Sequence, residues 1–381
     1  MSELKCPYRK KCGGCQLQNL PYNRQLSFKQ VKAIKLLGKY CHVDEIIGMK
    51  NPYHYRNKVQ AAFCEKGGEI LSGVYQSTTK SIVPVDSCLI EDPIADEIIL
   101  TVRKLLKSFK LRPFNSQTNK GFLRHILVKR SSKTNQTMVV LVTAVKEFKP
   151  ASKFINALLS RHPEITTVVQ NINTKYNGLM LGDETSVLYG DGYIEDILCG
   201  YKFKISPKAF YQINPTQTEV LYGKALEFAE LSGKERLLDA YCGTGTIGII
   251  ASKMAKSVAG VELNPDSVKD ALTNAEINCV KNIEFYEADA GDFMVEAAAM
   301  GEKFDVVIMD PPRAGASLEF LRCLVKLSPE KIVYISCNPE TQSRDVSFLT
   351  RKGYKVKKIQ PVDMFPHTEH IEVITYLTKI I

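Results

Sequence analysis

Short continuous apolar runs alternate regularly with more polar segments over the last part of the chain, from residue 235 onward. Short apolar runs are separated by segments with helical periodicity, a pattern typical of a buried parallel sheet covered by helices on both faces. The predicted strands are residues 235–241, 257–262, 283–288, 304–310, 331–336, 354–362 and 371–378, with helices in the first five gaps. Residues 363–370 are too few for a helical crossover, so we expect the last two strands to pair antiparallel.

The preceding residues have a different pattern. Short β-rich runs alternate with helical stretches near 93–108 and 150–160, and turn-forming residues separate them. The β-rich runs are residues 59–63, 126–129, 137–142 and 167–172, and a helix near 216–231 leads into the last part. We therefore predict three domains: a cysteine-rich loop with a basic helix (1–40), a central α+β domain that binds RNA (41–205) and an α/β domain (206–381).

The composition is that of a globular protein, with 44% hydrophobic and 24% charged residues. No stretch approaches the roughly 18 apolar residues that a membrane-spanning helix requires. The first residues lack the apolar run of a signal peptide. We therefore expect a cytoplasmic protein without a membrane partner, whose clustered cysteines serve metal binding or catalysis rather than disulfides.

The net charge of +10 is concentrated near the amino terminus. Residues 1–60 hold twelve Lys and Arg against three Asp and Glu, a balance of +9. Such a block favours an anionic polymer as partner, above all nucleic acid. The alternative is a solvated helix face, because Lys29, Lys32, Lys35 and Lys39 have helical spacing.

A glycine-rich turn follows the first strand of the α/β part. Gly243, Gly245 and Gly248 form G-x-G-x-x-G, and Glu262 ends the next strand. The glycines allow a close approach of ligand to backbone, and the acid can bind ribose hydroxyls. The motif alone does not distinguish NAD from S-adenosylmethionine. Asp239, before the glycines, favours S-adenosylmethionine, because its carboxylate can accept a hydrogen bond from the ammonium group of that cofactor.

Other polar residues also fall at the carboxyl ends of the predicted strands, where open α/β sheets bind ligands. Asp289 follows the third strand, Asp310 ends the fourth and Cys337 follows the fifth. Glu372 begins the last strand, and because that strand runs backwards, its start lies on the same edge. We therefore expect Cys337 and Glu372 to face one pocket.

A cysteine and a carboxylate beside a methyl donor suggest methylation of uracil at carbon 5. A thiolate that adds to carbon 6 makes carbon 5 nucleophilic, and a base then removes the carbon 5 proton. Cys337 is the candidate nucleophile and Glu372 the candidate base. The alternative for Cys337 is a small core side chain. His367 and His370 are weak candidates for a metal site, since no third ligand lies nearby in sequence.

Four segments give the chain a resemblance to the RNA uracil-5 methyltransferase family, which includes tRNA T-loop enzymes and 23S rRNA enzymes. They are Phe210–Asn214, Asp310–Arg313, Ser336–Pro339 with Arg344 and Asp345 after it, and Asp363–Glu372. The resemblance implies a Rossmann-like class I methyltransferase fold of seven strands, the last antiparallel. It implies that S-adenosylmethionine is bound by Gln212, Tyr241, Glu262 and Asp310. The sequence pattern itself adds three candidate cofactor-binding residues, Asp239, Gly243 and Asp289. Cys337 and Glu372 match the family's nucleophile and base; Gln212 follows from the resemblance alone.

Three cysteines near the amino terminus have the spacing C-x5-C-x2-C. They are Cys6, Cys12 and Cys15. With one more ligand they suit tetrahedral zinc or a cubane iron–sulfur cluster, and the spacing alone leaves both open. The resemblance implies a 4Fe-4S cluster with Cys88 as the fourth ligand, and Cys41 and Cys64 are alternatives for that place.

The resemblance also bears on the substrate. Many rRNA enzymes of the family carry an amino-terminal barrel before the cysteines, and we expect it to be absent here because the first cysteine is residue 6. A chain that has the cysteine cluster but lacks the barrel is most similar to the shorter 23S rRNA enzymes. We therefore expect a monomer that forms 5-methyluridine in 23S rRNA, with tRNA as the alternative. An amino-group methyltransferase and a redox-responsive RNA-binding protein with an inactive fold are the other classes.

Overall fold

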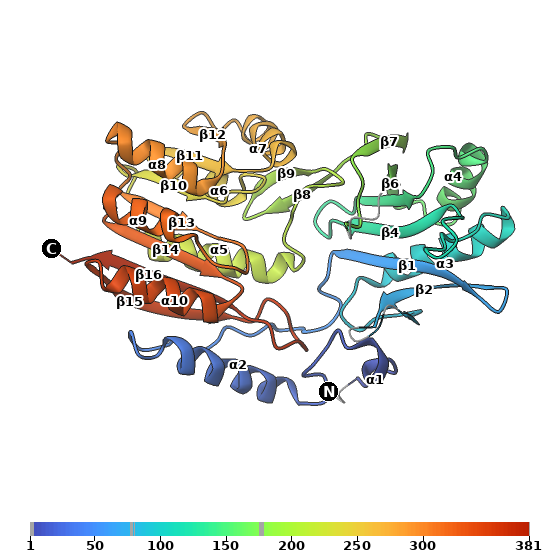
Figure 1. Ribbon diagram of the computed structural model, residues 1–381, viewed down its shortest axis with the longest axis horizontal. Helices are drawn as coiled ribbons and strands as arrows, with labels where there is room; N and C mark the ends of the chain where they lie inside the picture. Colours follow the sequence, from blue (N-terminus) through green and yellow to red (C-terminus); the bar gives the residue numbers. More distant parts are fainter. Residues whose placement is uncertain (1–3, 77–78, 80, 175–178, 381) are drawn as a thin grey trace. The chain divides into compact units, whose positions relative to one another are not determined.

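The computed structural model describes residues 4–76, 79, 81–174 and 179–380 (Figure 1). Contacts divide the chain into two compact units. Unit 1 comprises Met1–Asn19, Pro52–Ile197 and Lys204–Lys208, and unit 2 comprises Leu20–Asn51, Leu198–Phe203 and Ala209–Ile381. Strands β8 (Ile194–Leu198) and β9 (Tyr201–Ile205) form a separate two-stranded sheet, and the residues of each are divided between the two units. Within the described ranges, no helix is long and apolar enough to span a membrane.

Unit 1 is built on a seven-stranded sheet in the order β3-β2-β1-β4-β5-β6-β7. Its elements are α1 (Arg9–Cys12), β1 (Lys58–Lys66), β2 (Glu69–Tyr75), β3 (Ile82–Pro84), α3 (Pro93–Ser108), β4 (Leu123–Arg130), β5 (Thr137–Thr143), α4 (Ala151–Leu159), β6 (Ile165–Ile172) and β7 (Glu184–Tyr189). All neighbours are antiparallel except β5 and β6, which α4 connects. Helices α3 and α4 bury their apolar side chains against the sheet. The predicted α+β organisation is confirmed, with β2, β3 and β7 as strands that the sequence did not predict.

Unit 2 contains the predicted α/β sheet, in the order β12-β11-β10-β13-β14-β16-β15. Its elements are α2 (Tyr22–Leu37), α5 (Pro215–Ala229), β10 (Arg236–Ala240), α6 (Thr246–Ser252), β11 (Ser257–Glu262), α7 (Pro265–Ile277), β12 (Ile283–Glu287), α8 (Ala290–Met300), β13 (Val306–Met309), α9 (Leu318–Leu327), β14 (Lys331–Ser336), α10 (Pro339–Thr350), β15 (Tyr354–Val362) and β16 (Glu372–Lys379). Strand β16 is antiparallel to both β14 and β15, as predicted. Helices α8, α9, α10 and α2 share one apolar cluster on the sheet, while α5, α6 and α7 contact its other face (Figure 1).

The predicted segment 1–40 is divided between the two units. The cysteine loop belongs to unit 1, whereas α2 packs in unit 2, where Ala33 and Leu37 enter the core. The expectation of a basic helix is confirmed, but Lys29 does not share the solvated face of the other lysines. Its side chain is fully buried, because it lies in the i, i+4 stripe that α2 turns toward the sheet.

Candidate functional site

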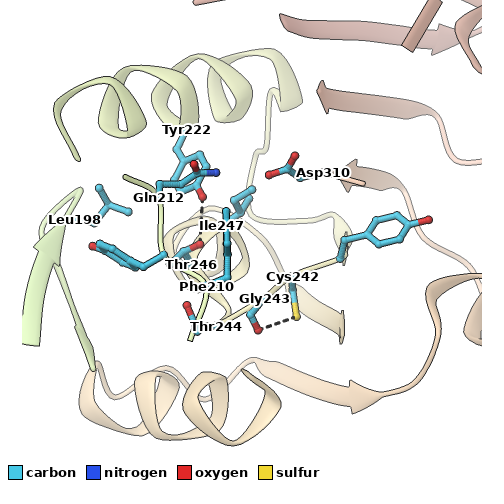
Figure 2. Close-up of a pocket in the computed structure, with 12 residues that line it drawn as sticks. Leu198, Phe210, Gln212, Tyr222, Cys242, Gly243, Thr244, Thr246, Ile247 and Asp310 are labelled. Carbon is cyan, nitrogen blue, oxygen red and sulfur yellow. Dashed lines mark hydrogen bonds between the residues drawn. The ribbon is translucent and has the colours of Figure 1, made fainter. Parts of the chain in front are cut away.

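A pocket lies at the carboxyl edge of the unit 2 sheet, where β10 and β13 end (Figure 2). The glycine-rich turn after β10 forms one wall, Tyr222 of α5 another, and Asp310 closes the pocket beyond β13. The lining residues are Leu198, Phe210, Tyr211, Gln212, Tyr222, Tyr241, Cys242, Gly243, Thr244, Thr246, Ile247 and Asp310. Four of the predicted cofactor residues, Gln212, Tyr241, Gly243 and Asp310, therefore meet in one cavity.

The turn between β10 and α6 has an unusual backbone. Tyr241, Gly243 and Gly245 all have positive φ, at 65°, 56° and 77°. Gly245 also leaves no room for a side chain, since a Cβ atom would lie 2.7 Å from Cζ of Phe285. The Glu262 carboxylate accepts a hydrogen bond from the Gly243 amide at 3.0 Å, so the acid that ends β11 fixes the turn.

Asp239 and Asp289 are bound to helix ends. Asp239 is buried and its Oδ2 accepts from the Gly248 amide at 2.7 Å, in the first turn of α6. Burial, with smaller contributions from Asp310 and Glu262, raises its pKa to about 7. Asp289 caps α8 by accepting from the Gly291 amide at 2.7 Å. Neither residue lines the pocket, and their contact with a cofactor stays a prediction.

The antiparallel pairing of β14 and β16 places Cys337 beside Glu372. Ser336 pairs with Val373, so the residue after Ser336 and the residue before Val373 are neighbours at the sheet edge. Glu372 is 4% exposed, and its Oε2 has no hydrogen-bond partner. Burial, and then the charge of Asp310, raise its pKa well above the ordinary value. The pKa of Asp310 is raised by burial to about 7.

The same groups act on the thiol. Burial, and then the charges of Glu372 and Asp310, raise the pKa of Cys337 to about 11. Arg313 opposes them, since its charge and its hydrogen bond with the thiol lower that pKa. The structure therefore brings together a thiol, two carboxyl groups and a guanidinium at the carboxyl edge of the sheet. Of these groups only Asp310 lines the pocket, so that Cys337 and Glu372 face it stays a prediction. Arg313 belongs to one of the motifs of the resemblance, but no role was predicted for it; its position three residues after Asp310 was the available signal.

The amino-terminal cysteines lie in unit 1 with Cys88. Burial, and then the nearby Cys12 and Cys6, raise the pKa of Cys15 to about 12. The pKa of Cys88 is also raised by burial, with smaller contributions that include Cys15. The four thiols are thus close enough to interact electrostatically, although no group of three or more His, Cys, Asp or Glu side chains among the described residues is arranged to hold a metal ion. All four are free of disulfides.

Comparison with known proteins gives a consistent result. Residues 21–380 match the sequence model of the family described as tRNA (Uracil-5-)-methyltransferase. An uncharacterized RNA methyltransferase of Clostridium acetobutylicum is 42% identical over 100% of this chain and 84% of its own, and one of Clostridium tetani is 42% identical over 99% and 83%. The crystal structure of Pyrococcus abyssi tRNA (uracil-54, C5)-methyltransferase with S-adenosyl-L-homocysteine is similar with a TM-score of 0.81, at 30% identity over 96% of this chain and 86% of that one.

Proposed function

The chain belongs to the tRNA (uracil-5-)-methyltransferase family, and on this premise we propose that it methylates carbon 5 of a uridine in RNA. That it is an RNA methyltransferase with a class I fold follows from the comparisons. The observation that carries the finer proposal is the juxtaposition of Cys337 and Glu372 across β14 and β16. A thiol nucleophile and a carboxylate base are the two groups that this reaction requires.

The pocket fits S-adenosylmethionine, which supplies the methyl group when bound. The turn at Gly243 exposes backbone to a ligand, and the amide side chain of Gln212 lies in the same cavity (Figure 2). Tyr241 also lines it. Asp310 lines the pocket and also interacts with Glu372 and Cys337. It would therefore hold one end of the cofactor next to the reacting thiol. Glu262, which fixes the turn, would accept hydrogen bonds from the ribose with its remaining lone pairs.

The protein residues act before and after methyl transfer. The Cys337 thiolate forms a bond to carbon 6 of the uracil ring, and the electron pair of the 5,6 double bond moves into an enolate. Carbon 5 then takes the methyl group. The Glu372 carboxylate removes the carbon 5 proton, the double bond re-forms and the thiolate leaves. Arg313 favours the charged forms of both groups, because its charge lowers the pKa of Cys337 and of Glu372.

We propose 23S rRNA as the substrate, from the likeness to the shorter rRNA enzymes of the family. A tRNA T-loop is the second candidate, favoured by the similarity to the Pyrococcus abyssi tRNA enzyme over 96% of this chain. The two require different RNA-binding surfaces but the same chemistry. We further propose that the protein acts as a cytoplasmic monomer.

A 4Fe-4S cluster bound by Cys6, Cys12, Cys15 and Cys88 is a separate proposal. Its support is the donor chemistry: Cys6 raises the pKa of Cys12, both raise the pKa of Cys15, and Cys15 raises the pKa of Cys88. The two rival ligands have weaker support: the pKa of Cys64 responds to Lys66 and to no other cysteine, and Cys41 belongs to unit 2. The cluster would order the cysteine loop, and no step of the methylation passes through it.

The proposed function is tested with labelled S-adenosylmethionine and purified 23S rRNA and tRNA, followed by mapping of the product. We expect 5-methyluridine from the wild type and from Cys279→Ala, a control at an exposed cysteine. Cys337→Ala should yield no product and no covalent adduct. Methylation by Cys337→Ala at the wild-type rate would point instead to an amino-group methyltransferase. RNA binding without methylation would point to an inactive, redox-responsive binding protein.

A further inference from the structure

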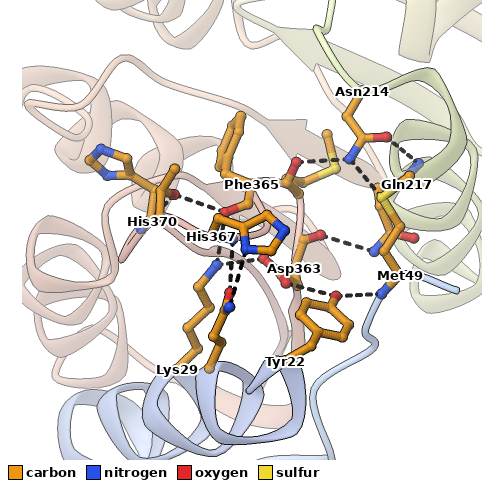
Figure 3. Close-up of polar contacts among 12 residues, drawn as sticks. Tyr22, Lys29, Met49, Asn214, Gln217, Asp363, Phe365, His367 and His370 are labelled. Atoms are coloured by element: carbon orange, nitrogen blue, oxygen red, sulfur yellow. Dashed lines mark hydrogen bonds and ion pairs between the residues drawn. The ribbon is translucent and has the colours of Figure 1, made fainter. Parts of the chain in front are cut away.

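Helix α2 contacts the segment that precedes the candidate base through a fully buried ion pair (Figure 3). Nζ of Lys29 lies 2.5 Å from Oδ1 of Asp363, and both side chains are 0% exposed. Lys29 also donates to the carbonyl of Phe365 at 3.0 Å. Removing two charges from water is costly, so such a pair adds little net stability, while loss of one partner leaves the other charge buried and uncompensated.

Two further side chains on the same face of α2 contact this segment. The Tyr22 hydroxyl donates to Oδ2 of Asp363 at 2.9 Å and accepts from the Met49 amide at 2.7 Å. Oε1 of Gln25 accepts from the His367 amide at 2.9 Å, and its Nε2 lies 3.2 Å from Nδ1 of the same histidine. His367 has φ 69°, a conformation that residues other than glycine keep only where the surroundings impose it.

The segment is also held from the side of α5. Asn214 donates to the Met364 carbonyl at 2.9 Å, and Gln217 donates to the Asp363 carbonyl at 3.1 Å (Figure 3). Asn214 is also the N-cap of α5 and lies two residues after Gln212, which lines the pocket. The backbone at Asp363 is thus fixed from two directions, by α2 and by the start of α5.

This anchoring is adjacent to Glu372. Asp363 directly follows Val362, the residue that pairs with Glu372 between β15 and β16. The Glu372 carboxylate is 4% exposed, and its Oε2 has no hydrogen-bond partner, so no direct hydrogen bond to that oxygen fixes its position. Its placement depends on the backbone at this end of the β15–β16 hairpin.

We propose that Lys29 and Asp363 are positioning residues that hold Glu372 in place for removal of the carbon 5 proton. The inference rests on the proposed function, because it assigns the pair to one step of that reaction. Addition of Cys337 and methyl transfer precede this step and involve other residues. Loss of the pair should therefore slow the release of RNA from the adduct more than its formation.

The test compares Lys29→Met with Lys326→Met, the same change at an exposed position of α9 in the same unit. We expect Lys29→Met to lower kcat by roughly 10- to 100-fold, the effect of misplacing a reacting group by about 1 Å. The methylated RNA–protein adduct should accumulate on denaturing gels, while the affinity for S-adenosyl-L-homocysteine stays at the wild-type value. Lys326→Met should behave as wild type in all three measurements. Equal turnover of the two variants would overturn the proposal.

A second variant covers the case in which Lys29→Met leaves Asp363 buried and uncompensated and the protein unfolds. Lys29→Met with Asp363→Asn removes both charges. Adduct accumulation in this double variant supports the proposal, and wild-type turnover overturns it.

Hydrogen exchange in the wild type gives a readout that does not depend on activity. The amides of Asp363 and His367 donate to the Ile47 carbonyl and to Gln25, and should exchange as slowly as those of β16. Fast exchange at both amides would overturn the anchoring itself. A wild type that methylates no uridine, with slow exchange intact, would instead refute the proposed function.

Discussion

Replacing Glu372 by glutamine should affect the two halves of the proposed reaction in opposite directions. The amide keeps the shape of the side chain but cannot accept the carbon 5 proton. It also removes a negative charge beside Cys337. We therefore expect the variant to form the covalent adduct at least as fast as wild type, to methylate the ring, and then to stall before release.

The size of the first effect follows from the state of the thiol. With a pKa of about 11, Cys337 is a thiolate in about one molecule in a thousand at pH 8, against about one in ten for a thiol with the ordinary pKa of 9.0. Burial is the largest cause of this rise, and the charge of Glu372 is the next. Without that charge the pKa of Cys337 should fall. The difference should grow as pH rises, because the raised pKa of Glu372 leaves it uncharged at lower pH.

The assay is rapid mixing with RNA and S-adenosylmethionine over a range of pH, followed by denaturing electrophoresis. We expect the adduct to form with rates that converge for wild type and Glu372→Gln at low pH and diverge at high pH. The glutamine variant should accumulate adduct, whereas wild type should turn over. Slower addition with an unchanged pH profile would mean that the charge of Glu372 does not raise the pKa of Cys337. Normal turnover of the variant would assign the base to another group, such as Asp310 or a water molecule.

Anaerobically purified protein should contain iron, and Cys88→Ser should lose it whereas Cys64→Ser should keep it; stoichiometric zinc without iron in metal analysis would contradict the cluster. Lys35→Glu with Lys39→Glu should weaken RNA binding and reduce the slope of log affinity against log salt by about 1.4, the value for two phosphates on single-stranded RNA. An unchanged slope in filter binding would show that this helix face is only solvated. Gly245→Ala should lower the free energy of unfolding by about 1–3 kcal/mol, because the φ of Gly245 is 77° and a Cβ would clash with the ring of Phe285. A urea titration with an unchanged midpoint would refute this.

The α/β part of the fold was predictable because its strands are buried on both faces and read as continuous apolar runs. Strands β11, β14 and β15 begin and end where the sequence predicted. In unit 1 two edge strands were missed: β3 is only three residues long and ends in proline, and β7 has mostly exposed side chains. The antiparallel pairing of β15 and β16 was predictable from the length of their connection alone.

The candidate site was predictable to the extent that topology determines it. Cys337 and Glu372 are 35 residues apart in the sequence, yet the reversal of the last strand is enough to place both at one edge of the sheet. The register of β14 and β16 confirms that they are neighbours. Electrostatic effects were not predictable in this way. The high pKa of Cys337 depends on how deeply the thiol is buried and on the side-chain directions of Glu372 and Asp310, which no spacing in the sequence gives.

Lys29 shows the same limit from the opposite side. The sequence grouped it with three other lysines by helical spacing, although it falls in another stripe: Gln25, Lys29, Ala33 and Leu37 are four residues apart and all buried. The stripe was present in the sequence, but a lysine within it is tolerated only if a carboxylate meets it there. That carboxylate, Asp363, is 334 residues away in the chain. An inward-facing lysine on an otherwise amphipathic helix therefore predicts a buried acid without identifying it. Here the acid directly follows β15, the strand whose last residue pairs with the candidate base on β16.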